Sequence, residues 1–237
     1  MPVRRYQPWD TDIPFGSYLN ATYAWYDWAL TVPKTLANGD HPLKHDHGAN
    51  AMAGQPAAKG LVCLGTHWSR GSDPKAKSPF VRAFDLDSGM SILINGTSSM
   101  IVPEKYPHQF PTGVEEAIKD ERDIMDRARS IIDRAFAVVT IRHEQKPIEW
   151  FSSYSGELER IRPQEIKICN VSKDLWDNYR KGGQVHAALD GYWLLLRPLD
   201  PGKYTIGISC REPYFAGGQD EYFYADVTYD LTVKKGR

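Results

Sequence analysis

The most regular hydrophobic pattern in the chain lies near its C-terminal end, between positions 223 and 233. Apolar and polar residues alternate there without interruption. One set of alternate positions holds Phe223, Ala225, Val227, Tyr229, Leu231 and Val233, and the other holds Tyr224, Asp226, Thr228, Asp230 and Thr232. Because successive side chains of a strand point to opposite faces, this pattern predicts a strand with one buried and one solvated face.

Two apolar runs precede this strand, and turn-forming residues stand at their borders. Asp190-Gly191 comes before the run that begins at Tyr192, and Asp200-Pro201-Gly202 separates that run from the next one. Proline at the second position and glycine at the third favour a tight reversal of the chain. The sequence therefore predicts a turn at 190–191 and a hairpin through 200–202.

Two segments have the periodicity of helices. Over 17–30, apolar and aromatic residues recur every three to four positions, with Ser17 as a candidate N-cap and Pro33 just beyond the end. Over 112–136, a longer apolar stripe follows the same period, and charged residues occupy the other face. We predict a short N-terminal helix from the first segment and a long amphipathic helix from the second.

Short apolar runs between turn signals predict the remaining strands. They lie at 61–65, 81–84, 90–94, 137–142, 148–154 and 165–171. Many short strands separated by turns are typical of an all-β sandwich, and 237 residues suit one large β domain. We therefore predict a mainly β fold, an antiparallel, jelly-roll-like β-sandwich in a single domain over 1–237. The helix near 112–136, the short N-terminal helix and an extended arm over 1–16 complete the prediction.

Charge and hydropathy exclude several classes of partner. With 29 basic and 30 acidic residues the net charge is −1, so no overall field favours nucleic acid or an anionic membrane. No apolar run approaches the roughly 20 residues that a membrane helix needs. The N-terminal residues lack the apolar stretch of a signal peptide. Three widely spaced cysteines argue against a disulfide framework, although one pair could form. We predict a cytoplasmic location.

Aromatic residues are frequent, at 12% of the chain, with 7 Trp and 13 Tyr. In a β-sandwich such side chains can fill the core, or they can line a pocket for an apolar or sugar-like ligand. The residues predicted to bind a small-molecule ligand are Trp25, Trp28, Trp68, Tyr192 and Trp193.

The clearest candidate for chemistry is a histidine-rich stretch from Asp40 to Gly48. If this stretch is extended, His45 and His47 point the same way, and His41 or Asp40 could supply a third ligand. Imidazole and carboxylate ligands suit a divalent metal such as zinc or iron and leave positions open for chemistry. The predicted metal ligands are His41, His45 and His47.

Two other interpretations of these histidines stay open. Without a metal, His45 or His47 could act as a general acid or base near neutral pH, oriented by a neighbouring aspartate. Alternatively, the imidazoles only form hydrogen bonds with the loop backbone. His67 follows a predicted strand, precedes Trp68 and could lie at a pocket mouth. The predicted catalytic residues are His45, His47 and His67.

Five motifs are distinctive as a set: Trp25-x-x-Trp28-Ala29-Leu30, Gly48-Ala49-Asn50-x-x-x-Gly54-Gln55, Asp190-Gly191-Tyr192-Trp193, Pro201-Gly202-Lys203-Tyr204-Thr205-Ile206 and Val227-Thr228-Tyr229. Together they resemble a family of mostly uncharacterised bacterial proteins, many of them secreted. The resemblance extends from about Tyr23 to Val233 and implies a β-sandwich that carries one helix. It implies no reaction. The chain departs from the family in lacking an export signal and in carrying histidines between His41 and His47.

Three functions are consistent with these observations. The first is a small-molecule enzyme that performs a biosynthetic tailoring step on an apolar substrate, such as cyclisation, hydrolysis or isomerisation, with the histidine-rich loop and an aromatic-lined pocket. The second is a non-catalytic binding module for a sugar or hydrophobic ligand. The third is a structural protein whose aromatic residues form the interface of a homo-oligomer. The sequence has no nucleophile-elbow, phosphate-loop, dinucleotide or nucleic-acid-binding motif.

Overall fold

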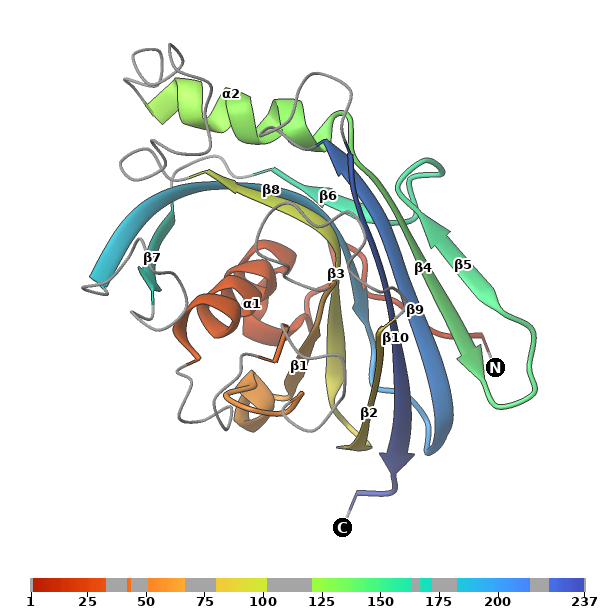
Figure 1. The fold of residues 1–237 in the computed structure, drawn as a ribbon. Helices are drawn as coiled ribbons and strands as arrows, with labels where there is room; N and C mark the ends of the chain where they lie inside the picture. The colour runs from red at the N-terminus through yellow and green to blue at the C-terminus, as the bar shows by residue number, and fades with distance from the viewer. Residues whose placement is uncertain are drawn as a thin grey trace.

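The computed structural model describes residues 2–32, 42–43, 51–66, 80–101, 121–162, 167–171, 183–213 and 222–236. Within these ranges the protein is mainly β, with two sheets arranged like a sandwich, as predicted. Figure 1 shows helix α1 against one side of the first sheet and the second sheet on its other side. Helix α2 crosses one end of the two sheets.

The first sheet has the strand order β1-β3-β8-β6, and β7 also pairs with β8. Its strands are β1 (Leu61–Leu64), β3 (Ser91–Ile101), β6 (Glu159–Ile161), β7 (Lys167–Val171) and β8 (Gly183–Leu196). The second sheet has the order β2-β10-β9-β4-β5. Its strands are β2 (Phe80–Asp87), β4 (Phe136–His143), β5 (Glu149–Ser152), β9 (Gly202–Pro213) and β10 (Tyr222–Lys234). Pairing is antiparallel except for β1 with β3 and β2 with β10, which are parallel.

Helix α1 (Tyr18–Thr31) confirms the predicted N-terminal helix. The Ser17 side chain accepts a hydrogen bond from the Asn20 amide and caps the first turn. Helix α2 (Glu121–Ile132) ends earlier than predicted, because β4 begins at Phe136. Residues 112–120, where the predicted helix would begin, lie outside the described residues. Two short 3-10 turns, η1 (Pro14–Gly16) and η3 (Pro56–Lys59), complete the helical elements.

Two large layers of apolar side chains hold the sheets and α1 together, and a smaller cluster of Ile124, Ala128 and Ala188 packs α2 on β8. One large layer lies between α1 and the first sheet and includes Trp25, Trp28 and Trp193. The other large layer lies between the two sheets and takes its residues from alternate positions of the strands. In β10, the predicted inner positions 225, 227, 229, 231 and 233 are all buried. The alternation read from the sequence is therefore confirmed.

The predicted turn at Asp190-Gly191 is wrong, because both residues lie inside the long strand β8. A Cβ atom at Gly191 would lie 2.7 Å from the Thr97 carbonyl oxygen, so a side chain has no room. The Asp190 carboxylate is fully buried and forms an ion pair with Arg160. Gly191 therefore allows close packing against β3, and Asp190 pairs with Arg160. The two residues do not mark a turn.

The predicted hairpin through 200–202 is also wrong. The strands before and after it, β8 and β9, belong to different sheets. The chain changes direction there but crosses from the first sheet to the second. Strand β9 then pairs with β4 and β10.

Candidate functional site

Three of the predicted ligand-binding residues lie in the core beside α1. Trp25 and Trp193 are only 2% and 1% exposed, and their rings meet edge to face at 5.4 Å. The indole nitrogens of Trp25 and Trp28 donate hydrogen bonds of 2.8 Å to the carbonyl oxygens of Leu64 and Ala53. These contacts satisfy the polar atoms of both rings and leave little indole surface for a ligand.

Of the other predicted site residues, the structure describes Tyr192 alone. Tyr192 is half-buried on the opposite face of β8, and the guanidinium of Arg160 lies over its ring at 5.7 Å. Trp68, His41, His45, His47 and His67 lie outside the described residues. Among the side chains that the structure does describe, no group of three or more His, Cys, Asp or Glu could hold a metal ion.

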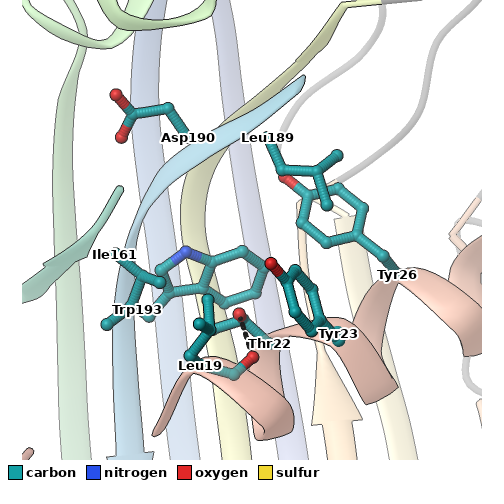
Figure 2. A pocket seen from close by; sticks show the side chains of 8 residues that line it. All are labelled: Leu19, Thr22, Tyr23, Tyr26, Ile161, Leu189, Asp190 and Trp193. Atoms are coloured by element: carbon teal, nitrogen blue, oxygen red, sulfur yellow. Dashed lines mark hydrogen bonds between the residues drawn. The ribbon is translucent and has the colours of Figure 1, made fainter. Parts of the chain in front are cut away.

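A small pocket opens between α1 and β8 (Figure 2). It is lined by Leu19, Thr22, Tyr23, Tyr26, Ile161, Leu189, Asp190 and Trp193. Its cavity volume is about 10 Å³, about the space that one water molecule needs, so a small organic molecule would not fit without rearrangement. In Figure 2 the Asp190 carboxylate points away from the aromatic rings, consistent with its ion pair to Arg160.

The carboxyl group of Glu212 on β9 lies between the two sheets, near a bulge in β3. The register shifts between Asn95 and Thr97, and a Cβ atom at Gly96 would lie 3.1 Å from the Ala137 Cβ on the second sheet. The Thr97 hydroxyl donates a hydrogen bond across the sheets to Glu212. Burial raises the pKa of Glu212 to about 7, although the hydrogen bonds from Thr97 and the Ser98 backbone lower it.

The described cysteine thiols are poor nucleophiles. Cys63 and Cys210 are free and buried. Burial raises the pKa of each thiol well above its ordinary value, so neither forms thiolate readily at neutral pH.

The outer face of the second sheet, which points away from the core, carries several exposed aromatic side chains. Trp150 on β5 is 62% exposed, Tyr224 on β10 is 59% exposed, and Tyr154 just after β5 is 89% exposed. The Tyr154 ring contacts the edge of Phe136 at a centroid distance of 5.7 Å. Contiguous exposed apolar surface often marks an interaction site, so a sheet face that carries several exposed rings is a candidate for one.

Short side chains lie between these aromatic residues. The register places Thr140 of β4 opposite Trp150, Gly207 of β9 opposite Thr140, and Thr228 of β10 opposite Gly207. The neighbouring row contains Val138 and, opposite it on β9, Ser209. We call the surface formed by these five short residues and the aromatic residues Trp150, Tyr154, Phe136 and Tyr224 the aromatic face.

Gly207 keeps the centre of the aromatic face low. A Cβ atom at this position would lie 2.5 Å from the Thr140 hydroxyl oxygen. The Thr140 hydroxyl therefore occupies the space above the Gly207 backbone. The result is a low floor of hydroxyl groups, the Val138 side chain and backbone, with aromatic rings beside it.

Charged groups around the aromatic face interact with neighbouring side chains. The Thr205 hydroxyl and the Asp230 carboxylate are 2.9 Å apart, and Lys234 pairs with Asp85. The Arg211 guanidinium lies 4.1 Å from the centre of the Tyr222 ring. The surface therefore combines aromatic rings and hydroxyls with charges of both signs.

Trp150, Tyr154 and Tyr224 were not among the site residues predicted from the sequence. The sequence feature that could have identified such residues is a large aromatic side chain at a solvated position of a predicted strand, as for Tyr224. Comparison with known protein families, curated proteins and solved structures finds no match for this chain. In the described part of the chain, no helix is both long enough and apolar enough to cross a membrane.

Proposed function

We propose that the protein is a non-catalytic binding module whose aromatic face binds carbohydrate. The observation that carries this proposal is the group of exposed rings, Trp150, Tyr154 and Tyr224, beside a floor that carries Thr and Ser hydroxyls. A sugar ring has an apolar C–H face that stacks on aromatic rings and hydroxyl groups that exchange hydrogen bonds with polar side chains. Amphipathic aromatic residues suit such a ligand because they offer a large apolar surface at low entropic cost.

Affinity electrophoresis in gels that contain soluble polysaccharides tests this proposal. The panel includes neutral β-linked and α-linked glucans, xylan, mannan, and the anionic polymer polygalacturonate. We expect at least one polysaccharide to retard the protein and Trp150→Ala/Tyr224→Ala to abolish the retardation. Trp9→Ala is the matched control, because Trp9 is 77% exposed on the N-terminal arm, outside the aromatic face. Carbohydrate binding by this face would be rejected if a polysaccharide retarded all three proteins equally, or if no polysaccharide retarded any of them.

A self-association surface is the competing explanation for the exposed rings. Size-exclusion chromatography with light scattering on the same three proteins separates the two cases. A stable wild-type homo-oligomer that Trp150→Ala/Tyr224→Ala converts to monomer would assign the face to a subunit interface and contradict the proposal.

A small-molecule enzyme is a second candidate, favoured by the position of Leu43. This residue lies in the middle of the histidine-rich stretch and is fully buried. Its carbonyl oxygen accepts a 3.1 Å hydrogen bond from Arg82, and a Cβ atom added at Gly65 would lie 3.4 Å from its side chain. His45 is two residues from Leu43, and His67 is two residues from Gly65. Leu43 and Gly65, described residues close to His45 and His67 in the sequence, therefore lie close together.

Elemental analysis tests the metal-dependent form of this second candidate. The wild-type protein, purified without a histidine tag, is compared with His45→Ala/His47→Ala. Near-stoichiometric zinc or iron that the double variant loses would support a metal site at His41, His45 and His47.

We also propose a cytoplasmic location, because free thiols such as those of Cys63 and Cys210 are typical of a reducing compartment.

A further inference from the structure

We infer that the aromatic face accepts an extended, uncharged, β-1,4-linked glycan chain that crosses the strands diagonally from Trp150 to Tyr224. This inference rests on the proposed function and specifies the ligand of the same surface. Three features of the described residues lead to it: the separation of the aromatic rings, the balance of charge, and the shape of the floor.

The first feature is the separation of Trp150 and Tyr224. Trp150 lies opposite Thr140 on β4, whereas Tyr224 lies in the row of Arg211 and Phe136. The two aromatic residues are three strands apart and four residues apart along the strands. With about 4.8 Å between strands and about 3.4 Å per residue, each component is about 14 Å and the diagonal is about 20 Å. One sugar ring cannot reach both side chains, but a chain of several sugars can.

The second feature is the balance of charge on the outer positions of the second sheet. The basic residues there are Arg142, Lys203, Arg211 and Lys234, and the acidic residues are Asp85, Asp87, Asp226 and Asp230. Opposite charges are interspersed, as in the pair of Lys234 with Asp85. A polyanionic glycan would gain no net attraction from this arrangement and would meet several carboxylates. An uncharged chain avoids that repulsion.

The third feature is the low floor between the rings. Thr140, Ser209 and Thr228 have short side chains and Gly207 has none, whereas Arg211 and Asp226 border the Tyr224 end of the path. Neighbouring rows of a sheet lie side by side, so these residues form a broad surface and not a narrow groove. Equatorial β-1,4 linkages give a flat ribbon with exposed C–H faces, which can lie on such a surface. The helical coil of an α-1,4-linked glucan would touch it at few points.

Isothermal titration calorimetry with defined oligosaccharides tests the inference. The probes are cello-, xylo-, manno- and N-acetylchito-oligosaccharides of one to six sugars, malto-oligosaccharides of the same lengths, and oligogalacturonates. We expect at least one neutral β-1,4 series to gain about tenfold or more in affinity between two and five sugars. Malto-oligosaccharides and oligogalacturonates should bind at least about tenfold more weakly than the best β-1,4 hexasaccharide.

Single variants test the diagonal path. Trp150→Ala and Tyr224→Ala should each remove most of the gain with chain length while leaving the weak binding of the disaccharide nearly unchanged. Trp9→Ala should bind all probes as the wild type does. Affinity that does not depend on chain length, or that is equal for malto-oligosaccharides or oligogalacturonates, would overturn the inference. Failure of all four neutral β-1,4 series would also overturn it.

The two proposals can fail separately. Retardation by an α-linked or branched polysaccharide, abolished in Trp150→Ala/Tyr224→Ala, would leave carbohydrate binding intact and refute only the extended β-1,4 ligand. Absence of any polysaccharide binding would refute both.

Discussion

Replacing Glu212 with glutamine should make the protein more stable at pH 8 and remove part of its pH dependence. Glu212 lies on the inner side of β9, beyond Cys210, and accepts a hydrogen bond from the Thr97 hydroxyl of the first sheet. Glutamine has the shape of a protonated glutamate and keeps an oxygen that accepts this hydrogen bond. The substitution therefore tests the charge of the group with little change in packing.

The magnitude follows from the raised pKa of Glu212. Burial raises this pKa from 4.5 to about 7, and such a difference corresponds to about 3 kcal/mol. Because the residue is partly exposed, we expect about 2–3 kcal/mol. Between these two pKa values the native state binds more protons than the unfolded state, so its stability falls as the pH rises. The stabilising contribution of protonated Glu212 is fully present below about pH 4.5 and is lost through about pH 7.

Urea unfolding of the wild type and Glu212→Gln at pH 5 and pH 8 measures this effect. Between the two pH values, the wild type should lose about 2–3 kcal/mol of unfolding free energy that the variant retains. Glu144→Gln is the matched control, because the Glu144 side chain is 58% exposed, and it should follow the wild type. Equal pH profiles for the wild type and Glu212→Gln, or a less stable Glu212→Gln at pH 8, would refute the reasoning.

Three further predictions concern the stability of the core, each measured by urea unfolding. Asp190→Ala should lower the free energy of unfolding by about 3–5 kcal/mol, because it leaves the Arg160 guanidinium without its buried bidentate partner. A decrease below about 1 kcal/mol would contradict this. Gly191→Ala should lower the free energy of unfolding by about 1–3 kcal/mol through overpacking against the neighbouring strand β3, and a neutral effect would show that the strand can shift. Trp25→Ala should lower the free energy of unfolding by about 3–5 kcal/mol, whereas Trp150→Ala should stay within about 0.5 kcal/mol of the wild type. Similar decreases for both variants would contradict the assignment of Trp25 to the core and Trp150 to the surface.

Local patterns carried enough information to predict several elements. The alternation over 223–233 predicts β10 and its buried face, because the two-residue period has one structural meaning. Helix α1 follows from its periodicity and from Ser17, whose side chain caps it. These features depend on neighbours in the sequence, so the sequence alone specifies them.

Features that depend on distant contacts could not be predicted in the same way. Asp190-Gly191 has turn chemistry, yet its role is set by Arg160 on β6 and by Thr97 on β3. The crossing after Leu196 places β9 in the second sheet because β4 and β10 supply its partners. No local pattern distinguishes this crossing from a hairpin.

The candidate site also depends partly on local sequence patterns and partly on distant contacts. Trp25 and Trp193 were predicted as ligand contacts because aromatic residues suit both cores and pockets, and the structure packs them together in the core. The rings of Trp150 and Tyr224 come from different strands and share a face only through the register of four strands. That register is a property of the assembled sheet.

The most direct test of carbohydrate binding by the aromatic face is the map of backbone amide shifts in nuclear magnetic resonance spectra. The 26.9 kDa protein is titrated with the polysaccharide fragment that binds most tightly in the gel assay. If the aromatic face binds carbohydrate, shift changes cluster at Val138, Thr140, Gly207, Ser209 and Thr228 and around Trp150 and Tyr224. Shift changes concentrated instead at the pocket between α1 and β8, with the second sheet unaffected, would contradict carbohydrate binding by this face.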